Sequence, residues 1–178
     1  DMNTPGFDFL TGAGLVDAVG ALSGVAVDFG DAPDSYGTLL ASGGARHAFS
    51  PVLRLGTSVD VEADGQPTGT ASGDDDNNVD DEDGVVFAST LIARLDATFV
   101  VTASAAGKID AWIDYNLNGV FDAAEKIFDS VNVVAGINNL ITTVPDNIPT
   151  AATFARFRFS SAGGLSPTGL APDGEVED

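Results

Sequence analysis

Short runs in which apolar and polar residues alternate are the feature that most constrains this fold. The clearest run is TFARFRFS, residues 153–160. A period of two sends successive side chains to opposite faces of a β-strand. One face then holds Ala155, Phe157 and Phe159, and the other holds Phe154, Arg156 and Arg158. The run therefore predicts a strand with its phenylalanines in a core, and we expect the two arginines to pair with nearby carboxylates rather than to bind a ligand.

Similar runs recur along the chain, and Gly, Pro, Asn and Asp separate them. Short strands bounded by such turn residues are typical of an all-β fold. With 178 residues, of which 44% are hydrophobic, the chain is long enough to bury a core. We predict an antiparallel β-sandwich of jelly-roll or immunoglobulin-like type. The predicted strands lie within residues 52–55, 84–92, 97–104, 108–115, 126–134, 138–144 and 153–160.

The first 24 residues differ from the rest of the chain. After a glycine-rich turn, apolar residues follow at helical spacing, namely Leu15, Val16, Val19 and Leu22. The sequence therefore predicts a short helical or extended arm at 1–24 and a sandwich domain at 25–178. Because the chain begins at Asp1 rather than at a methionine, we expect it to be a processed or excised piece of a longer precursor.

The charge is strongly acidic: 27 Asp and Glu face 7 Lys and Arg, for a net charge of −20. Nucleic acids and anionic membranes need a basic surface, so we expect neither as a partner. No apolar run reaches the roughly 18 residues of a membrane span. The chain has no cysteine and therefore no disulfide. Halophilic solvation would spread acids over the surface, whereas here they cluster, most densely between Asp60 and Asp83.

The sharpest motif is DYNLNGVFDAAE, residues 114–125, which fits the calcium-loop template D-x-[DN]-x-[DN]-G-x5-E at every specified position. Such a loop supplies side-chain oxygens at alternate positions, a backbone carbonyl at the seventh position and a carboxylate at the twelfth, while a glycine permits the sharp turn. The candidate calcium ligands are Asp114, Asn116, Asn118, the Val120 carbonyl, Asp122 and Glu125.

The residues on both sides of this loop alternate as strands do, so the loop is expected to join two strands. We therefore expect a structural ion that holds a strand connection together, and not a calcium sensor that opens paired helices. The alternative is an Asn-, Asp- and Gly-rich hairpin without an ion. We favour the ion because a bare turn has no evident use for Glu125 at the twelfth position.

We expect no catalytic activity. His47 is the only histidine, and no G-x-S-x-G nucleophile motif accompanies it. A single histidine of this kind is more often a packed or capping residue than a catalyst. Trp112, the only tryptophan, is expected to pack in the core beside the loop.

Several motifs together resemble those of the GEVED domain of secreted and surface-anchored bacterial proteins. They are DFGDAPDSYGT, GARH, LGTSVDVEADGQP, DDEDGV, AWIDYNLNGVFD and the terminal DGEVED, which cover residues 27–178. The resemblance implies a β-sandwich module, often appended to secreted proteases or large surface proteins, without catalytic activity and with a role in calcium-dependent adhesion or attachment. The family pattern continues with an aromatic residue after the final Asp, and this chain stops at Asp178.

The acidic residues of these motifs are candidate ligands of a second cation, as the resemblance implies. They are Asp28, Asp31, Asp34, Glu62, Asp64, Asp81, Asp83, Glu175 and Glu177. Carboxylates from distant segments would have to converge for such a site. The alternative is a solvated acidic surface whose aspartates cap turns.

The segment TPGFDFLTGAGLVDA, residues 4–18, resembles the end of a subtilisin-like protease domain. Three functions follow for a protein outside the cell. The first is a calcium-stabilised module for surface attachment, adhesion or assembly, with protein or glycan partners. The second is a subunit of an extracellular filament or sheath, a homopolymer built by exchange of the 1–24 arm. The third is an accessory domain of a secreted protease.

Overall fold

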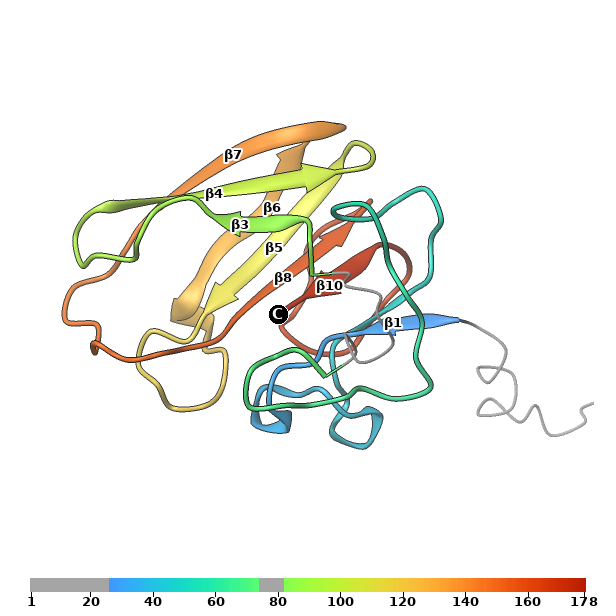
Figure 1. Ribbon diagram of the computed structural model, residues 1–178, viewed down its shortest axis with the longest axis horizontal. Helices are drawn as coiled ribbons and strands as arrows, with labels where there is room; N and C mark the ends of the chain where they lie inside the picture. The colour runs from blue at the N-terminus through green and yellow to red at the C-terminus, as the bar shows by residue number, and fades with distance from the viewer. Residues whose placement is uncertain (1–25, 74–81) are drawn as a thin grey trace, which may run out of the picture.

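The computed structural model describes residues 26–73 and 82–178, in which ten strands form three sheets (Figure 1). Three short 3-10 turns accompany them, and no helix in these residues has the length and apolar character needed to cross a membrane. The strands are β1 (Val27–Phe29), β2 (Arg46–Ala48), β3 (Val85–Phe87), β4 (Asp96–Ala103), β5 (Gly107–Ile113), β6 (Lys126–Val133), β7 (Gly136–Thr143), β8 (Ala155–Ser160), β9 (Leu170–Ala171) and β10 (Glu175–Glu177). The turns are η1 (Asp34–Tyr36), η2 (Leu40–Ser42) and η4 (Ala123–Glu125).

Two antiparallel sheets make the sandwich. One has the strand order β10-β8-β5-β6 and the other the order β3-β4-β7. Strand β4 pairs with β7 along its whole length, from Asp96 opposite Thr143 to Ala103 opposite Gly136. The predicted all-β sandwich is thereby confirmed. A third, smaller sheet has the order β1-β2-β9, and its β2 and β9 run parallel.

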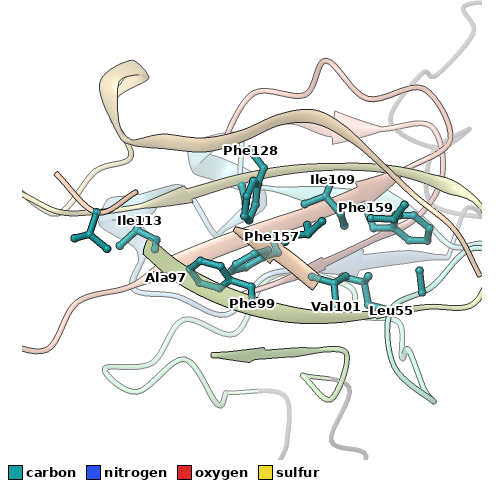
Figure 2. Close-up of a cluster of buried hydrophobic side chains, with 14 of the residues drawn as sticks. Leu55, Ala97, Phe99, Val101, Ile109, Ile113, Phe128, Phe157 and Phe159 are labelled. Carbon is teal, nitrogen blue, oxygen red and sulfur yellow. The ribbon is translucent and has the colours of Figure 1, made fainter. Parts of the chain in front are cut away.

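Phenylalanines from both sheets meet in the sandwich core (Figure 2). Phe99 of β4 lies with its ring centroid 5.6 Å from that of Phe128 of β6 and 5.6 Å from that of Phe157 of β8. Offset and edge-on ring contacts of this kind stabilise a core beyond the area they bury. Phe159 and Ile109 are fully buried in the same cluster. The face of β8 that the alternation predicted to be apolar is therefore the core face.

The opposite face of β8 is also buried. Arg156 and Arg158 are 0% and 1% exposed, because the segment around η1 and the loop before β9 cover them. On the same face of the neighbouring β5, Trp112 packs with Tyr36 and Phe121 in a second apolar cluster. The expected place of Trp112 beside the loop is confirmed, and the four-stranded sheet becomes the middle layer of the molecule.

The two arginines hold this outer layer differently. Arg156 makes a two-pronged ion pair with Asp178, with Nε–Oδ1 and Nη2–Oδ2 distances of 2.5 and 2.6 Å. Arg158 instead donates to backbone carbonyls, among them those of Arg46 and Gly169, at 3.0 and 2.8 Å. The expectation of carboxylate partners holds for Arg156, whereas carbonyl oxygens satisfy most donors of Arg158.

The strand prediction fails where strands are very short. Residues 52–55 form no strand, and Leu55 makes only an isolated bridge with Ala103. Four strands of two or three residues were not predicted, namely β1, β2, β9 and β10. Such segments are too short to show alternation, and pairing with distant partners creates them. The predicted arm at 1–24 lies outside the described residues.

Candidate metal centre

The loop Asp114–Glu125 connects two neighbouring antiparallel strands. Strand β5 ends at Ile113, β6 begins at Lys126, and η4 forms the last turn of the loop. The predicted strand–loop–strand context is confirmed. Gly119 has a φ of +83°, a left-handed conformation that glycine adopts without steric cost. The glycine of the template therefore stands where the backbone requires it.

Asp114 is the centre of the loop's hydrogen bonding and is fully buried. Its Oδ1 accepts the backbone N–H groups of Leu117 and Asn118 at 2.6 and 3.3 Å, and its Oδ2 accepts that of Gly119 at 2.9 Å. The hydroxyl of Tyr36 also donates to Oδ2, at 2.7 Å. Four donors therefore surround one carboxylate, and hydrogen bonds to an ionised group are among the stronger ones in proteins.

Glu125 closes the other end of the loop. Its Oε1 accepts the backbone N–H groups of Tyr115 and Asn116 at 3.0 and 3.1 Å, and its Oε2 accepts that of Asp122 at 2.9 Å. Its side chain is buried, with 4% of the residue exposed. The premise that a bare turn has no use for a glutamate at the twelfth position is therefore wrong, because this glutamate caps three backbone donors.

The middle of the loop is more open. The side-chain amides of Asn116 and Asn118 donate through Nδ2 to Oδ2 of Asp122, at 3.1 and 2.8 Å. Their oxygens accept the N–H groups of Asn118 and Val120, at 2.9 and 3.0 Å. Asn116 and Asn118 therefore both lie within hydrogen-bond distance of Asp122, which brings three of the six candidate ligands together. Val120, the fourth, follows them closely in the chain.

The chemistry of this donor set suits a hard cation such as Ca²⁺, because every candidate atom is an oxygen. Its arrangement is that of a hydrogen-bonded turn, in which amide nitrogens rather than oxygens face Asp122. Turning an amide about its last bond exchanges nitrogen and oxygen without changing its shape. Across the part of the chain that the structure describes, no three carboxylate, imidazole or thiol side chains form a group that could hold a metal ion.

Two tyrosines lie against the carboxylates of the loop. Burial raises the pKa of Tyr36, and the hydrogen bond to Asp114 and its charge raise the pKa further. Burial and the charge of Glu125 raise the pKa of Tyr115 to about 12. Both hydroxyls are therefore protonated at neutral pH, so that Tyr36 serves as a donor to Asp114. The hydroxyl of Tyr115 is buried and has no hydrogen-bond partner among the described residues.

Three of the candidate ligands of a second cation cap turns. Asp34 accepts the N–H groups of Thr38 and Leu39 at 3.2 and 2.9 Å. Asp64 accepts that of Leu40 at 2.6 Å. Asp83 binds the backbone N–H of Thr57 at 2.9 Å and its hydroxyl. These contacts agree with the capping alternative; those of Asp34 are local, whereas those of Asp64 and Asp83 join segments 24 and 26 positions apart.

The other candidates reach backbone donors on neighbouring segments. The donors to Asp31, Glu62 and Glu177 are the N–H groups of Gly73, Phe29 and Gly84, at 2.7, 2.9 and 2.9 Å, and Glu175 accepts the N–H of Leu55. Asp31, Glu175 and Glu177 are buried. Asp81 lies outside the described residues. Their role as ligands of a second cation stays a prediction.

His47 is fully buried, and both its ring nitrogens are engaged. Nδ1 lies 2.7 Å from the carbonyl oxygen of Asp173, and Nε2 accepts a hydrogen bond from Nε of Arg158 at 3.0 Å. Nε2 can accept only in the neutral ring, and burial followed by the charge of Arg158 lowers the pKa of His47 well below 6.5. His47 is therefore a packed residue that orients Arg158.

The sequence did not point to several residues that support the site. Tyr36 lies 78 positions before its partner Asp114, and its only signal was its place in the motif DAPDSYGT. Asp110, fully buried on β5, pairs with Lys126 at 2.7 Å and accepts the N–H of Leu165 at 3.1 Å. Asp110 lies two positions before Trp112 and therefore on the same face of β5, but strand alternation does not indicate its partners.

The fold and the loop define a class: an all-β module whose sandwich carries an acidic, oxygen-rich strand connection. A family model described as the GEVED domain matches residues 108–178, from β5 to the end of the chain. This part is therefore similar to that domain, and the motifs before residue 108 lie outside the match. No curated protein and no solved structure matches the chain. The resemblance of residues 4–18 to a protease domain stays a prediction.

Proposed function

We propose that this chain is a non-catalytic, calcium-stabilised extracellular module for attachment, adhesion or assembly. The observation that carries the proposal is the loop Asp114–Glu125. All six of its candidate ligands are oxygens, it joins two sandwich strands, and it lies within the region similar to the GEVED domain. A cation there would tie β5 to β6, at the edge of the middle sheet.

Charge supports a cation in this loop. Asp114, Asp122 and Glu125 put three carboxylates within twelve residues, in a chain with a net charge of −20. A divalent cation would reduce their mutual repulsion. A ligand that binds only the folded state stabilises it by RT ln(1 + [L]/Kd), about 2.7 kcal/mol at a hundredfold excess over Kd. Calcium outside cells is abundant enough to fill even weak sites of extracellular modules.

Asp114 and Glu125 also hold the backbone of the loop. Both carboxylates accept backbone N–H groups, so hydrogen bonds also hold the turn, and calcium would add its stability to theirs. The ion would then stabilise the connection between β5 and β6 and would not act as a trigger of folding. Of the three carboxylates in the loop, Asp122 accepts the fewest backbone hydrogen bonds. Substituting Asp122 therefore tests the ion with the least disturbance of the turn.

The test is thermal unfolding of the full chain in EGTA, in millimolar Ca²⁺ and in millimolar Mg²⁺. We expect calcium to raise the melting temperature by several degrees and magnesium to raise it much less. Asp122→Asn should reduce the calcium shift, whereas Asp146→Asn, which removes the same charge from an exposed residue outside the loop, should leave it unchanged. Equal melting curves in EGTA and calcium would overturn the calcium proposal.

The attachment role needs a separate measurement. Binding of the purified chain to bacterial surfaces, matrix proteins and glycans is measured with and without calcium. We expect calcium-dependent retention on at least one of these surfaces, which Asp122→Asn weakens. A chain that binds none of them and does not self-associate at millimolar calcium would contradict the attachment role, even if calcium stabilises the fold.

A further inference from the structure

Strand β7 (Gly136–Thr143) forms an outer edge of the sandwich (Figure 1). It pairs with β4 on one side, and on its other side no strand of the described residues pairs with it. An eight-residue strand with a free edge presents a row of backbone donors and acceptors to any further strand. This outer side of β7 is called the β7 edge below.

The pairing with β4 decides which groups lie on the β7 edge. Val144, directly after β7, donates its N–H to the carbonyl of Leu95 at 2.9 Å. In an antiparallel ladder, residues alternate between those bonded to the partner strand and those whose N–H and C=O point away. Counting back from Val144, the outward-pointing residues are Ile137, Asn139, Ile141 and Thr143.

The side chains along β7 do not protect this edge. Natural sheets usually guard a long free edge with charged residues, proline or a bulge. The strand GINNLITT has no charged residue and no proline, and its pairing with β4 has no register shift. Ile137 and Ile141 are 70% and 60% exposed. In a chain of net charge −20, such an uncharged surface is where two copies can approach with least repulsion.

We propose that two copies of this chain associate through their β7 edges, as an antiparallel pair of strands related by a twofold axis. Asn139 lies opposite Asn139 of the second copy, and Ile137 lies opposite Ile141 of the second copy. The two three-stranded sheets then become one continuous six-stranded sheet. The free backbone groups at Ile137, Asn139 and Ile141 become hydrogen-bonded.

The sequence of β7 favours a second copy as the occupant of this edge. Outward-pointing residues must oppose one another, which allows only registers that differ by steps of two residues. The register centred on Asn139 sets both isoleucines against isoleucines and the amide against itself. The adjacent registers set isoleucine against asparagine. Opposed apolar side chains stabilise a strand pair, so β7 is complementary to itself in one register.

A twofold pair of this kind closes on itself. Each β7 edge is used once, so the product is a dimer and not a filament. A contact of one strand pair is small, and we expect a weak, concentration-dependent dimer. The pairing uses no residue of the loop Asp114–Glu125. It is therefore independent of the proposed calcium site, and either proposal can fail without the other.

Cysteine cross-linking tests the pairing directly, because the chain has no cysteine of its own. In a hydrogen-bonded antiparallel pair, opposed Cα atoms lie about 5.5 Å apart, within the range that a disulfide spans. Under mild oxidation, we expect full-length Asn139→Cys to form a covalent dimer at least about tenfold faster than Val52→Cys. Val52 is a matched control because it is 71% exposed and lies outside β7, in a loop whose backbone contacts Ser104 directly after β4.

Sedimentation measures the association without a cross-link. We expect the unmodified chain to shift from monomer towards dimer as concentration rises, and the shift to strengthen with salt, which screens the repulsion between copies. Asn139→Lys opposes two like charges at the axis and should abolish the dimer, whereas Val52→Lys should not. Equal cross-linking rates for the two cysteine variants, or a monomer at every concentration, would overturn the proposal. Monomer would also be the result if another segment or partner occupied the β7 edge.

Discussion

Tyr36 donates a hydrogen bond of 2.7 Å to Oδ2 of Asp114, across 78 positions of sequence. Both residues are buried, and Asp114 is the first residue of the candidate calcium loop. The bond ties the segment that covers the middle sheet to the strand connection at the sheet's edge. The loop is therefore anchored from outside its own hairpin, and its stability depends on the covering layer.

Removing this hydroxyl should weaken the fold. Tyr36→Phe leaves a buried carboxylate with one donor fewer, and a hydrogen bond to a charged group contributes about 1.5–3 kcal/mol. We expect a loss of about 2 kcal/mol in the free energy of unfolding, measured by urea denaturation in EGTA. Tyr115→Phe is the control, because the Tyr115 hydroxyl has no partner among the described residues, and its loss should be nearly neutral. Equal effects of the two variants would contradict the role of the Tyr36 bond.

Glu125 is predicted to stabilise the loop even without calcium. Glu125→Ala leaves the backbone N–H groups of Tyr115, Asn116 and Asp122 without an acceptor. We expect a loss of about 3 kcal/mol in urea denaturation in EGTA, because each orphaned donor costs about 1–3 kcal/mol and the three costs do not add fully. Asp122→Asn, which keeps its backbone N–H, should cost less than about 1 kcal/mol under the same conditions. A Glu125→Ala variant that is destabilised only in calcium would mean that the ion, not the turn, requires this carboxylate.

The ion pair between Arg156 and Asp178 should contribute far more to the free energy of unfolding than a surface ion pair does. Both side chains are fully buried, so Asp178→Ala leaves an uncompensated guanidinium inside the protein. Removing one partner of a buried pair typically costs about 3–5 kcal/mol.

The exposed pair of Arg94 and Asp146 is the matched comparison, since their side chains are 75% and 50% exposed. Asp146→Ala should cost less than about 1 kcal/mol. Urea denaturation of both variants at neutral pH measures the difference. Similar losses would mean that solvent reaches the buried pair.

Stability should fall below neutral pH because of His47. The native ring stays neutral, since its pKa lies well below the ordinary 6.5, whereas the unfolded ring binds a proton as the pH falls below 6.5. The unfolded state then binds more protons, so the free energy of unfolding decreases as pH falls. Below 6.5 a single group of this kind can contribute at most about 1.4 kcal/mol per pH unit, which sets an upper limit of about 2 kcal/mol between pH 7 and pH 5.

His47→Gln removes this titration. We therefore expect the variant to lose less stability than the unmodified chain between pH 7 and pH 5, by up to about 2 kcal/mol, whatever its stability at pH 7. Urea denaturation at both pH values gives the comparison. Parallel losses in the two proteins would show that carboxylates alone cause the acid sensitivity.

Sequence patterns predicted those features that depend on neighbours in the chain. Alternation assigned Phe157 and Phe159 to one face of β8 and Arg158 to the other, because successive side chains of a strand must point to opposite sides. The spacing of Asp114 and Gly119 placed the oxygen-rich turn between two strands, since both residues act within a few positions of each other. These two local predictions were confirmed, whereas the strand predicted at 52–55 does not form.

Only the tertiary structure decided what covers the second face of the middle sheet. Alternation indicated the face of β8 that carries Arg156 but not that Asp178 would be its partner. It also could not show that β1 and β9 belong to the layer that covers this face. A strand of two or three residues carries no period, and a hydrogen bond such as that from Tyr36 to Asp114 joins residues with no local relation. The amino-acid sequence by itself determined which faces are apolar and where the acidic turn lies. Burial between segments far apart in the chain decided which polar groups meet, because the loss of water at that interface obliges each of them to find a partner.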